Sequence, residues 1–385
     1  MNTWFVRKSR GSAVYRISVT APIALLVLVM GFALPTASNA QGANATEKTE
    51  AVSGAAFYSA REAKMSPAIA AQLKTLRAQL AKVAAPGFTI GYTEAMDRPL
   101  SQLAGTHIPA GTLEKAAQQN ALAAKALSID AADATQYHFP RPAPICRSAD
   151  AAFDWRKLNK VTSIKNQGGC GSCWDFAAAA AYESAYAIRN NIMLDTSEQH
   201  ILDCSGAGTC KGGWYGPVWD WMHTKKLANA SELPYTATDQ PCPASLAGHY
   251  QTVTWGFVAT GSSVPTTDQI KGAICEHGPV AVAMEATPLF QAYTGGVYSE
   301  ANVSGINHAV TIVGWDDATQ SWIVKNSWGT GWGESGYFRI RYGSNTIGYA
   351  AAWVEAPSAQ YKLNPAILSL ERVFPLKPIE MTKPQ

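Results

Sequence analysis

The residues best suited to covalent chemistry lie in one short segment, Gln167–Trp174, which reads QGGCGSCW. The alanine-rich stretch that follows predicts a helix beginning at Ser172, with Ser172 as its N-cap and Asp175 completing a capping box. Cys173 would then lie in the first helical turn, where free N–H groups and the helix dipole favour an anion. We therefore interpret Cys173 as a nucleophilic thiolate.

A thiolate nucleophile needs an imidazole that pairs with it and later protonates the leaving group. His308 stands at the head of an apolar strand pattern, and Asn326 follows another apolar run. The amide oxygen of Asn326 would fix the tautomer of His308, as the third member of a triad does. Gln167 and the N–H group of Cys173 would donate to a developing oxyanion, each donor contributing about 3 kcal/mol. Trp328 would shield the Asn326–His308 hydrogen bond from water.

Each of these residues also has another interpretation. Cys170 and Cys173 form a C-x-x-C pair, which occurs in redox and zinc sites. A zinc site would need a second matching pair, and the spacing of Cys204 and Cys210 does not provide it. A thioredoxin-like site would need a surrounding βαβ unit, which the pattern lacks. A single histidine before a strand is more often structural, and the sequence Asn-Ser-Trp-Gly also suits a simple turn.

The elements that must position these residues lie between residues 146 and 356, the part that contains every cysteine. The helix predicted to begin at Ser172 comes early, and short apolar runs bounded by glycine come later. These later runs are Val280–Val282, Ala309–Val313, Trp322–Val324 and Tyr337–Ile340. Helices followed by strands favour an α+β protein whose two halves face each other across a cleft.

The N-terminus has the three-part pattern of a secretory signal peptide over residues 1–40. Basic residues precede the uncharged apolar stretch Ala21–Leu34, and Ser38-Asn39-Ala40 supplies small residues for cleavage. This apolar stretch is shorter than the roughly 20 residues that a spanning helix needs, although an uncleaved membrane anchor remains the alternative. An export route would permit disulfide bonds among the seven cysteines.

Residues 41–145 carry a pattern of their own. A helix is expected from Ser66-Pro67 to Ala85, stopped by Pro86-Gly87, with one apolar face. That face comprises Ile69, Leu73, Leu76, Leu80 and Val83. A short strand (Phe88, Ile90, Tyr92), a second helix (Leu113–Leu127) and an extended connector (Phe139–Pro144) follow. We interpret the segment as a propeptide that is cut off between about Phe139 and Ala152; a permanent structural domain is the alternative.

The bulk composition limits the classes of protein. The 385 residues are 47% hydrophobic and 15% charged, which indicates a globular chain with a sizeable core rather than a disordered one. The length suits a catalytic unit of about 200 residues with accessory segments, the last being a tail at 357–385. A formal net charge of +3, without basic runs, gives no reason to expect a nucleic-acid partner.

The segment Gln167–Trp174, with His308 and Asn326 far downstream, resembles the signature of the papain family of cysteine peptidases. The resemblance runs from Phe153–Arg156 to Trp353. Further matching segments are Ser197–Gln199, Asp203-Cys204, Cys210–Gly213, Gly278–Val280 and Lys325–Gly336. So many segments in family order favour a peptidase over redox, zinc or purely structural interpretations.

The resemblance implies a two-lobed α+β fold, with a helical lobe and an antiparallel β-barrel-like lobe on either side of the active-site cleft. It implies peptide-bond hydrolysis through a thioester, without metal or cofactor, and a pocket that prefers a bulky apolar residue two positions before the cleaved bond. The implied substrate-binding residues are Gly212, Gly213, Trp214, Tyr215, Ala283, Ile306, Asn307, Trp328 and Ala352.

The resemblance also implies the disulfides Cys170–Cys210 and Cys204–Cys242. Cys146 and Cys275 either pair with each other or leave Cys275 as a buried thiol. Two departures stand out. Asp175 occupies a position where the family usually has alanine, and its charge would raise the Cys173 pKa. Residues 41–145 lack the usual propeptide helix pattern of the family.

We therefore expect an exported, secreted or periplasmic monomer that acts on protein or peptide substrates and is restrained by its own propeptide. No membrane contact is expected after removal of the signal, and no nucleic acid. Two other functions stay open at this stage. One is a catalytically silent papain-like binding protein, and the other is a transpeptidase or ligase that uses the same intermediate.

Overall fold

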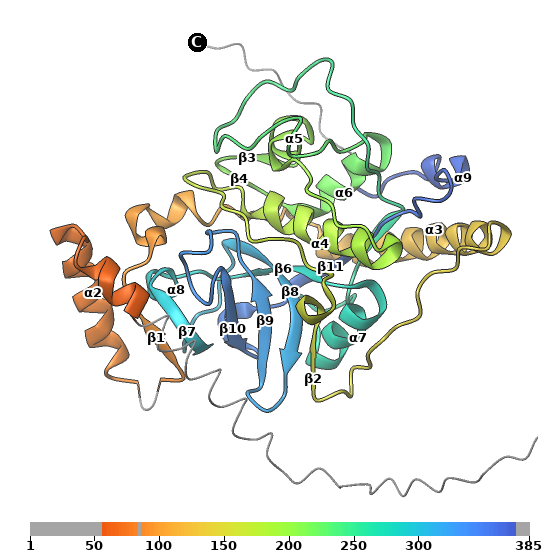
Figure 1. Cartoon of the computed structure of the whole chain (residues 1–385). Helices are drawn as coiled ribbons and strands as arrows, with labels where there is room; N and C mark the ends of the chain where they lie inside the picture. Colours follow the sequence, from red (N-terminus) through yellow and green to blue (C-terminus); the bar gives the residue numbers. More distant parts are fainter. Residues whose placement is uncertain (1–55, 84–85, 375–385) are drawn as a thin grey trace, which may run out of the picture. The chain divides into compact units, whose positions relative to one another are not determined.

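The structure is a computed structural model that describes residues 56–83 and 86–374 (Figure 1). The signal peptide expected at 1–40 and the end of the tail lie outside the described residues. A first helix covers residues 56–62. The helices that follow are α2 (Pro67–Leu80), α3 (Ala116–Gln136), α4 (Cys173–Asn190), α5 (Glu198–Cys204), α6 (Tyr215–Thr224), α7 (Thr267–His277), α8 (Pro288–Gln291) and α9 (Pro365–Leu368).

Most of the strands belong to one large sheet in the order β1-β7-β10-β9-β8-β6-β11-β5, and β2 pairs with β8 outside this path. Its pairs are antiparallel except β7 with β10. Its members are β1 (Phe88–Ile90), β2 (Ala152–Asp154), β5 (Thr254–Phe257), β6 (Val280–Met284), β7 (Tyr293–Tyr298), β8 (His308–Asp316), β9 (Ser321–Lys325), β10 (Tyr337–Arg341) and β11 (Tyr349–Glu355). Strands β3 (Gly208–Thr209) and β4 (Gly212–Gly213) form a separate small pair.

Two apolar cores define the two lobes. One core lies among β6 to β10 and α7, with Phe290, Trp315 and Trp332 as large buried members. The other surrounds the alanine-rich α4 and also includes Trp214 and Trp219 from the α6 region. Because alanine has no side chain beyond Cβ, α4 packs closely against its neighbours, and most of its residues are buried. The expected α+β fold with a helical lobe and a sheet lobe is confirmed.

The first predicted helix, α2, begins where the sequence predicts. Ser66 caps α2 by accepting a hydrogen bond from the Ile69 N–H group at 3.3 Å, and Leu73 and Leu76 are its buried residues. The expected continuation to Ala85 is wrong, because the chain leaves the helix at Ala81 and Val83 is half-exposed. The predicted strand forms as β1, which pairs with β7 of the sheet lobe.

The second predicted helix is longer than expected. A 3-10 turn at Leu113–Lys115 leads into α3, which runs to Gln136 rather than ending near Leu127. The extension is stabilised by burial, since Asp130 and Ala134 in its last turns are covered by other parts of the protein.

The start of α4 departs from the capping-box prediction. Ser172 is the N-cap residue, but its side chain makes no capping hydrogen bond. Its hydroxyl group instead pairs with the Tyr235 hydroxyl group at 2.7 Å. The helix therefore starts at the predicted place without the predicted cap, because a tertiary partner takes up the serine hydroxyl.

Three disulfides connect the described cysteines. Cys170–Cys210 and Cys204–Cys242 are the pairs implied by the resemblance, and the third bridge joins Cys146 to Cys275. Within the part of the chain that the structure describes, Cys173 is the free cysteine, and it is buried.

Candidate active site

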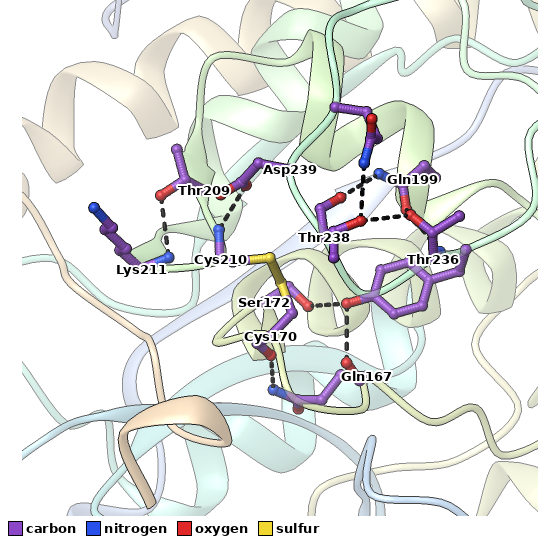
Figure 2. Close-up of a disulfide and its surroundings, with 12 residues drawn as sticks. Gln167, Cys170, Ser172, Gln199, Thr209, Cys210, Lys211, Thr236, Thr238 and Asp239 are labelled. Atoms are coloured by element: carbon purple, nitrogen blue, oxygen red, sulfur yellow. Dashed lines mark hydrogen bonds between the residues drawn. A yellow bond between two sulfur atoms is a disulfide. The ribbon is translucent and has the colours of Figure 1, made fainter. Parts of the chain in front are cut away.

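Cys173 is the first residue of α4, at the boundary between the two lobes. The loop before it is held in place by the Cys170–Cys210 bridge (Figure 2). Gly171 donates its N–H group to the Cys210 carbonyl at 2.9 Å, and Gln167 Nε2 donates to the Cys170 carbonyl at 2.8 Å. These contacts fix the approach of the chain to the helix and so fix the position of the Cys173 thiol.

His308 faces this helix from the sheet lobe. It begins β8, and Asn326 follows directly after the antiparallel partner strand β9, so the pairing brings both residues to the same end of the sheet. His308 Nε2 lies 2.9 Å from Asn326 Oδ1. The Trp328 ring is buried against the imidazole, with 4.8 Å between the ring centroids. The structure thus places Asn326 and Trp328 where the sequence analysis expects an orienting group and a shield.

The imidazole makes the thiol more acidic. Burial raises the pKa of Cys173, but the charge of His308 and hydrogen bonds from His308, Thr106 and the Ala309 backbone outweigh burial and lower it to about 7. Because Asn326 takes Nε2, Nδ1 is the ring nitrogen left for the thiol, and no other partner in the described chain competes for it. The pair therefore has the charge distribution of an activated cysteine nucleophile.

We expect this pKa to be visible in the pH dependence of alkylation. In the mature enzyme, the rate of Cys173 modification by iodoacetamide should rise with pH through a midpoint at or below about 7, because only the thiolate reacts. In a His308→Ala variant, the midpoint should move up toward the value of an ordinary cysteine, about 8.5. A wild-type midpoint near 8.5 would contradict the ion pair.

Gln167 and Trp328 hold a carbonyl oxygen beside the thiol. Gln167 Nε2 donates to the carbonyl of Leu103 at 3.1 Å, and Trp328 Nε1 lies 3.4 Å from the same oxygen. Ser327 Oγ donates to Gln167 Oε1 at 2.6 Å, which orients the amide with its nitrogen toward that carbonyl. The position of Gln167 therefore suits an oxyanion donor. In this structure its amide donates instead to a carbonyl of the protein's own chain, that of Leu103.

That carbonyl belongs to residues 103–107, which run across the nucleophile. The Gly105 N–H group and the Thr106 hydroxyl lie 3.3 and 3.2 Å from Cys173 Sγ. Backbone hydrogen bonds hold both sides of the segment: Thr106 donates to Asn307, His107 donates to Gly213, and Gly213 donates to Gly105. The sequence analysis missed these residues, because they lie between its predicted strand and helix and have no periodic pattern.

Gly105 supplies the one local signal for this segment. A Cβ atom at this position would lie 2.0 Å from the carbonyl oxygen of Gly171. Only glycine therefore fits against the loop that precedes Cys173. A glycine between Ala104 and Thr106 is the kind of residue that marks a close approach of two backbones.

The expected substrate-binding residues lie on both sides of residues 103–107. Gly213 and Asn307 bond to that segment through their backbones, and Gly212 lies next to His107. Ile306 is half-buried beside Asn307. The remaining expected pocket residues are buried: Trp214, Tyr215, Ala283 and Ala352. Ile108 and Leu113 of the N-terminal segment pack against the core that contains Trp214, Tyr215 and Ala352.

Asp175 lies behind the nucleophile, fully buried, and neither of its carboxyl oxygens has a hydrogen-bond partner in the described chain. Burial raises its pKa well above the usual value, and the nearby carboxylate of Glu198 adds to the shift, whereas Lys165 opposes it. Burial thus favours the uncharged acid. The negative charge that the sequence analysis expects beside the thiolate is correspondingly suppressed.

This burial predicts a pH-dependent cost in stability. The folded-state pKa of Asp175 lies above the unfolded value, so its contribution is retained at low pH and lost as the pH rises past about 4. Relative to wild type, an Asp175→Asn variant should gain up to about 1.4 kcal/mol of unfolding free energy per pH unit in this range. Denaturant unfolding between pH 4 and 7 measures the difference, with the exposed Asp268→Asn as the control. A pH-independent difference would contradict the assignment.

The zinc and redox alternatives for the cysteines can be compared with the described residues. No group of three or more His, Cys, Asp or Glu side chains in residues 56–83 and 86–374 is placed to hold a metal ion. Cys170 is bonded to Cys210, so the C-x-x-C sequence does not form a dithiol pair with Cys173. Among the helices of the described chain, none has the length and apolarity to cross a bilayer.

Comparison with known proteins agrees with this geometry. The sequence profile of the papain family cysteine proteases matches residues 149–356, more than half of the chain. The chain therefore belongs to the papain family of cysteine proteases.

Among curated relatives, fruit bromelain of Ananas comosus is 36% identical over 211 residues, which cover 54% of this chain and 59% of the bromelain. A viral cathepsin of Mamestra configurata nucleopolyhedrovirus is 39% identical over 207 residues, which cover 52% of this chain and 60% of the cathepsin. The match thus spans about three fifths of the length of these relatives.

Solved precursors are similar over a larger part of the chain. The digestive procathepsin L2 of Tenebrio molitor larval midgut superposes with a TM-score of 0.59 at 26% identity, covering 82% of this chain and 99% of the procathepsin. The recombinant stem bromelain precursor gives a TM-score of 0.57 at 26% identity, covering 74% of this chain and 88% of that precursor.

Proposed function

We propose that this protein hydrolyses peptide bonds through a thioester intermediate, as an endopeptidase made in an inhibited precursor form. The observation that carries the proposal is the arrangement of Cys173, His308 and Asn326 around a backbone carbonyl that Gln167 holds in place. Each group needed for acyl transfer has a position in this arrangement: a nucleophile, an acid–base residue with its orienting partner, and an oxyanion donor.

The chemistry follows from these positions. The Cys173 thiolate attacks the carbonyl carbon of a substrate peptide bond, and Gln167 stabilises the oxyanion. His308 gives its proton to the leaving amine, so the C–N bond breaks and an acyl thioester remains. His308 then takes a proton from a water molecule, which attacks the thioester and releases a carboxylic acid and the free thiol. Asn326 keeps the imidazole oriented through both steps.

A catalytically silent binding protein of the same fold is the main rival. It is disfavoured because a thiol acidified by His308 has no role in simple binding. Titration of the matured protein with a thiol-directed epoxide tests the two. We expect one equivalent to bind at Cys173 and to abolish hydrolysis of a peptide substrate in proportion. An enzyme that is fully labelled and keeps its turnover, or one that is never labelled, would contradict the proposal. Addition of an amine nucleophile separates hydrolysis from peptide transfer.

Export in an inhibited form is supported by two features. Residues 103–107 occupy the cleft, and three disulfides suit an oxidising compartment outside the cytosol. We infer that the chain is secreted or periplasmic and that its N-terminal segment inhibits it in cis. A tethered segment has a high effective concentration at the cleft, which keeps the enzyme closed until the chain is cut.

We predict a preference for a bulky apolar or aromatic residue two positions before the cleaved bond. The side chains expected to line this pocket carry no charge, so nothing there pairs with a basic side chain. These residues are Trp214, Tyr215, Ala283, Ile306 and Ala352. A peptide library assayed with the matured enzyme measures the preference. Arg or Glu selected over Leu, Val and Phe at this position would show the pocket to be wrong.

A further inference from the structure

Helix α3 covers an open edge of the large sheet. Among the strands of the described residues, β5 is the last in the sheet order and pairs only with β11. On its free side, Gln119 Nε2 donates to the Trp255 carbonyl at 2.8 Å. Asn120 accepts from the Phe257 N–H group at 2.8 Å and donates to the Phe257 carbonyl at 2.9 Å. The two side chains satisfy backbone groups that would otherwise need a neighbouring strand.

The other half of α3 is anchored through a buried carboxylate. Asp130 is 1% exposed and lies 3.2 Å from Arg141 Nε, 3.2 Å from the Tyr361 hydroxyl and 3.5 Å from Arg189 Nη2. Arg141 also binds Glu355 of β11 at 2.6 Å. Loss of α3 would leave the buried Arg189 of α4 without its carboxylate partner, which is costly in a desolvated position.

The C-terminal segment also contacts α3. Helix α9 contributes Ile367 to a small apolar cluster with Ala126 of α3 and Val253 next to β5. Asn364, the N-cap residue of α9, donates to Asp133 of α3 at 3.1 Å. Figure 1 shows α9 at the same end of the molecule as α3. The buried face of the helix therefore packs against both the sheet edge and the tail of the same chain.

The chain between the cleft and α3 is different in character. Thr106 is buried on the thiol, but Pro109 and Ala110 are exposed. Gly111 has a φ of +77°, and no heavy atom lies within 4 Å of a Cβ built there. An exposed turn of this kind is the usual location of a proteolytic cut. Everything that blocks the nucleophile lies before this turn, and α3 lies after it.

We propose that activation cuts the chain in the turn between Ile108 and Leu113, where Pro109 and Ala110 are exposed, and that α3 remains in the active enzyme as a permanent cap on β5. Water adds across the peptide bond, which leaves a carboxylate on the released segment and a new amino group in front of α3. The peptidase activity proposed above supplies this hydrolysis, whereas the retention of α3 depends only on its contacts. The active enzyme would then begin well before the expected boundary near residue 145.

The first test uses full-length Cys173→Ala precursors, which cannot process themselves. One carries the recognition sequence of a site-specific endopeptidase between Ala110 and Gly111, and the other carries it between Pro142 and Ala143. After cutting, gel filtration follows the release of the N-terminal fragment. We expect the fragment that ends at Pro142 to dissociate at least about ten times more slowly, because α3 still holds it. Equal rates would overturn the proposal. The result does not depend on catalysis, so failure of the proposed function would not affect it.

The second test follows the natural product of maturation. Mass spectrometry of the activated wild-type enzyme should find a first residue between Pro109 and Leu113. A first residue between Phe139 and Ala152 would overturn the proposal.

In the matured enzyme, Gln119→Ala should lower Tm by about 3 °C, because the Trp255 carbonyl loses its donor. Gln118→Ala, an exposed glutamine on the same helix, is the matched control and should change Tm by less than about 1 °C. Equal Tm values for the two variants would also count against a retained cap.

Discussion

Replacement of Cys173 by alanine should reduce peptide hydrolysis by at least about 10⁴-fold while leaving the protein folded. The thiol is the only group in the arrangement that can form the acyl intermediate, and His308 and Asn326 act through it. The alanine side chain fits the same position at the start of α4, a helix already rich in alanine. Turnover of a peptide substrate by purified, externally matured protein measures the loss.

The fold of this variant needs its own control. Cys173 takes no part in the three disulfides, so mass spectrometry should show the same three bridges in wild type and variant. Thermal unfolding should give similar Tm values. Near-normal turnover by the alanine variant would remove the basis of the proposed function.

A single methyl group at Gly105 should weaken the inhibition of the precursor. In Gly105→Ala, the new Cβ would lie 2.0 Å from the Gly171 carbonyl oxygen, a contact that backbone atoms can relieve only by moving apart. Overpacking of this kind costs about 1–3 kcal/mol, so Cys173 should become about 10- to 100-fold more reactive toward a bulky epoxide in the uncut precursor. The rate of labelling at neutral pH, before any cleavage, measures the effect.

Gly111→Ala is the matched control for this prediction. Gly111 has a positive φ but open space around it, so its replacement strains an exposed turn and leaves the cleft contacts in place. Its labelling rate should stay within about threefold of wild type. Equal rates for both alanine variants would mean that residues 103–107 do not close the cleft by close packing.

The sequence predicted the parts of the molecule whose chemistry is local. Ser66-Pro67 marks the start of α2, and the alanine run after Ser172 marks α4, because caps and helix propensity act over a few residues. The short apolar runs at Val280 and Ala309 mark β6 and β8, because strands that are buried on both faces need apolar residues at nearly every position.

Features that depend on distant partners were not predictable in the same way. The capping box at Ser172 fails because Tyr235, far along the chain, takes the hydroxyl group. The length of α3 depends on the burial of Asp130 by Arg141 and Arg189, which a helix pattern does not reveal. The placement of residues 103–107 on the thiol depends on backbone hydrogen bonds, which carry no side-chain signal at all.

The cover over Cys173 has a consequence for the way the protein acquires its disulfides. Seven cysteines form three bridges and leave one thiol over, and His308 lowers the pKa of that thiol. A thiolate attacks disulfides readily, so an accessible Cys173 would exchange with the neighbouring Cys170–Cys210 bridge during oxidative folding. Gly105 and Thr106 close the access to Cys173 Sγ in the precursor. In the inhibited precursor that we propose, the segment that closes the cleft would therefore also keep this thiol away from the other six cysteines.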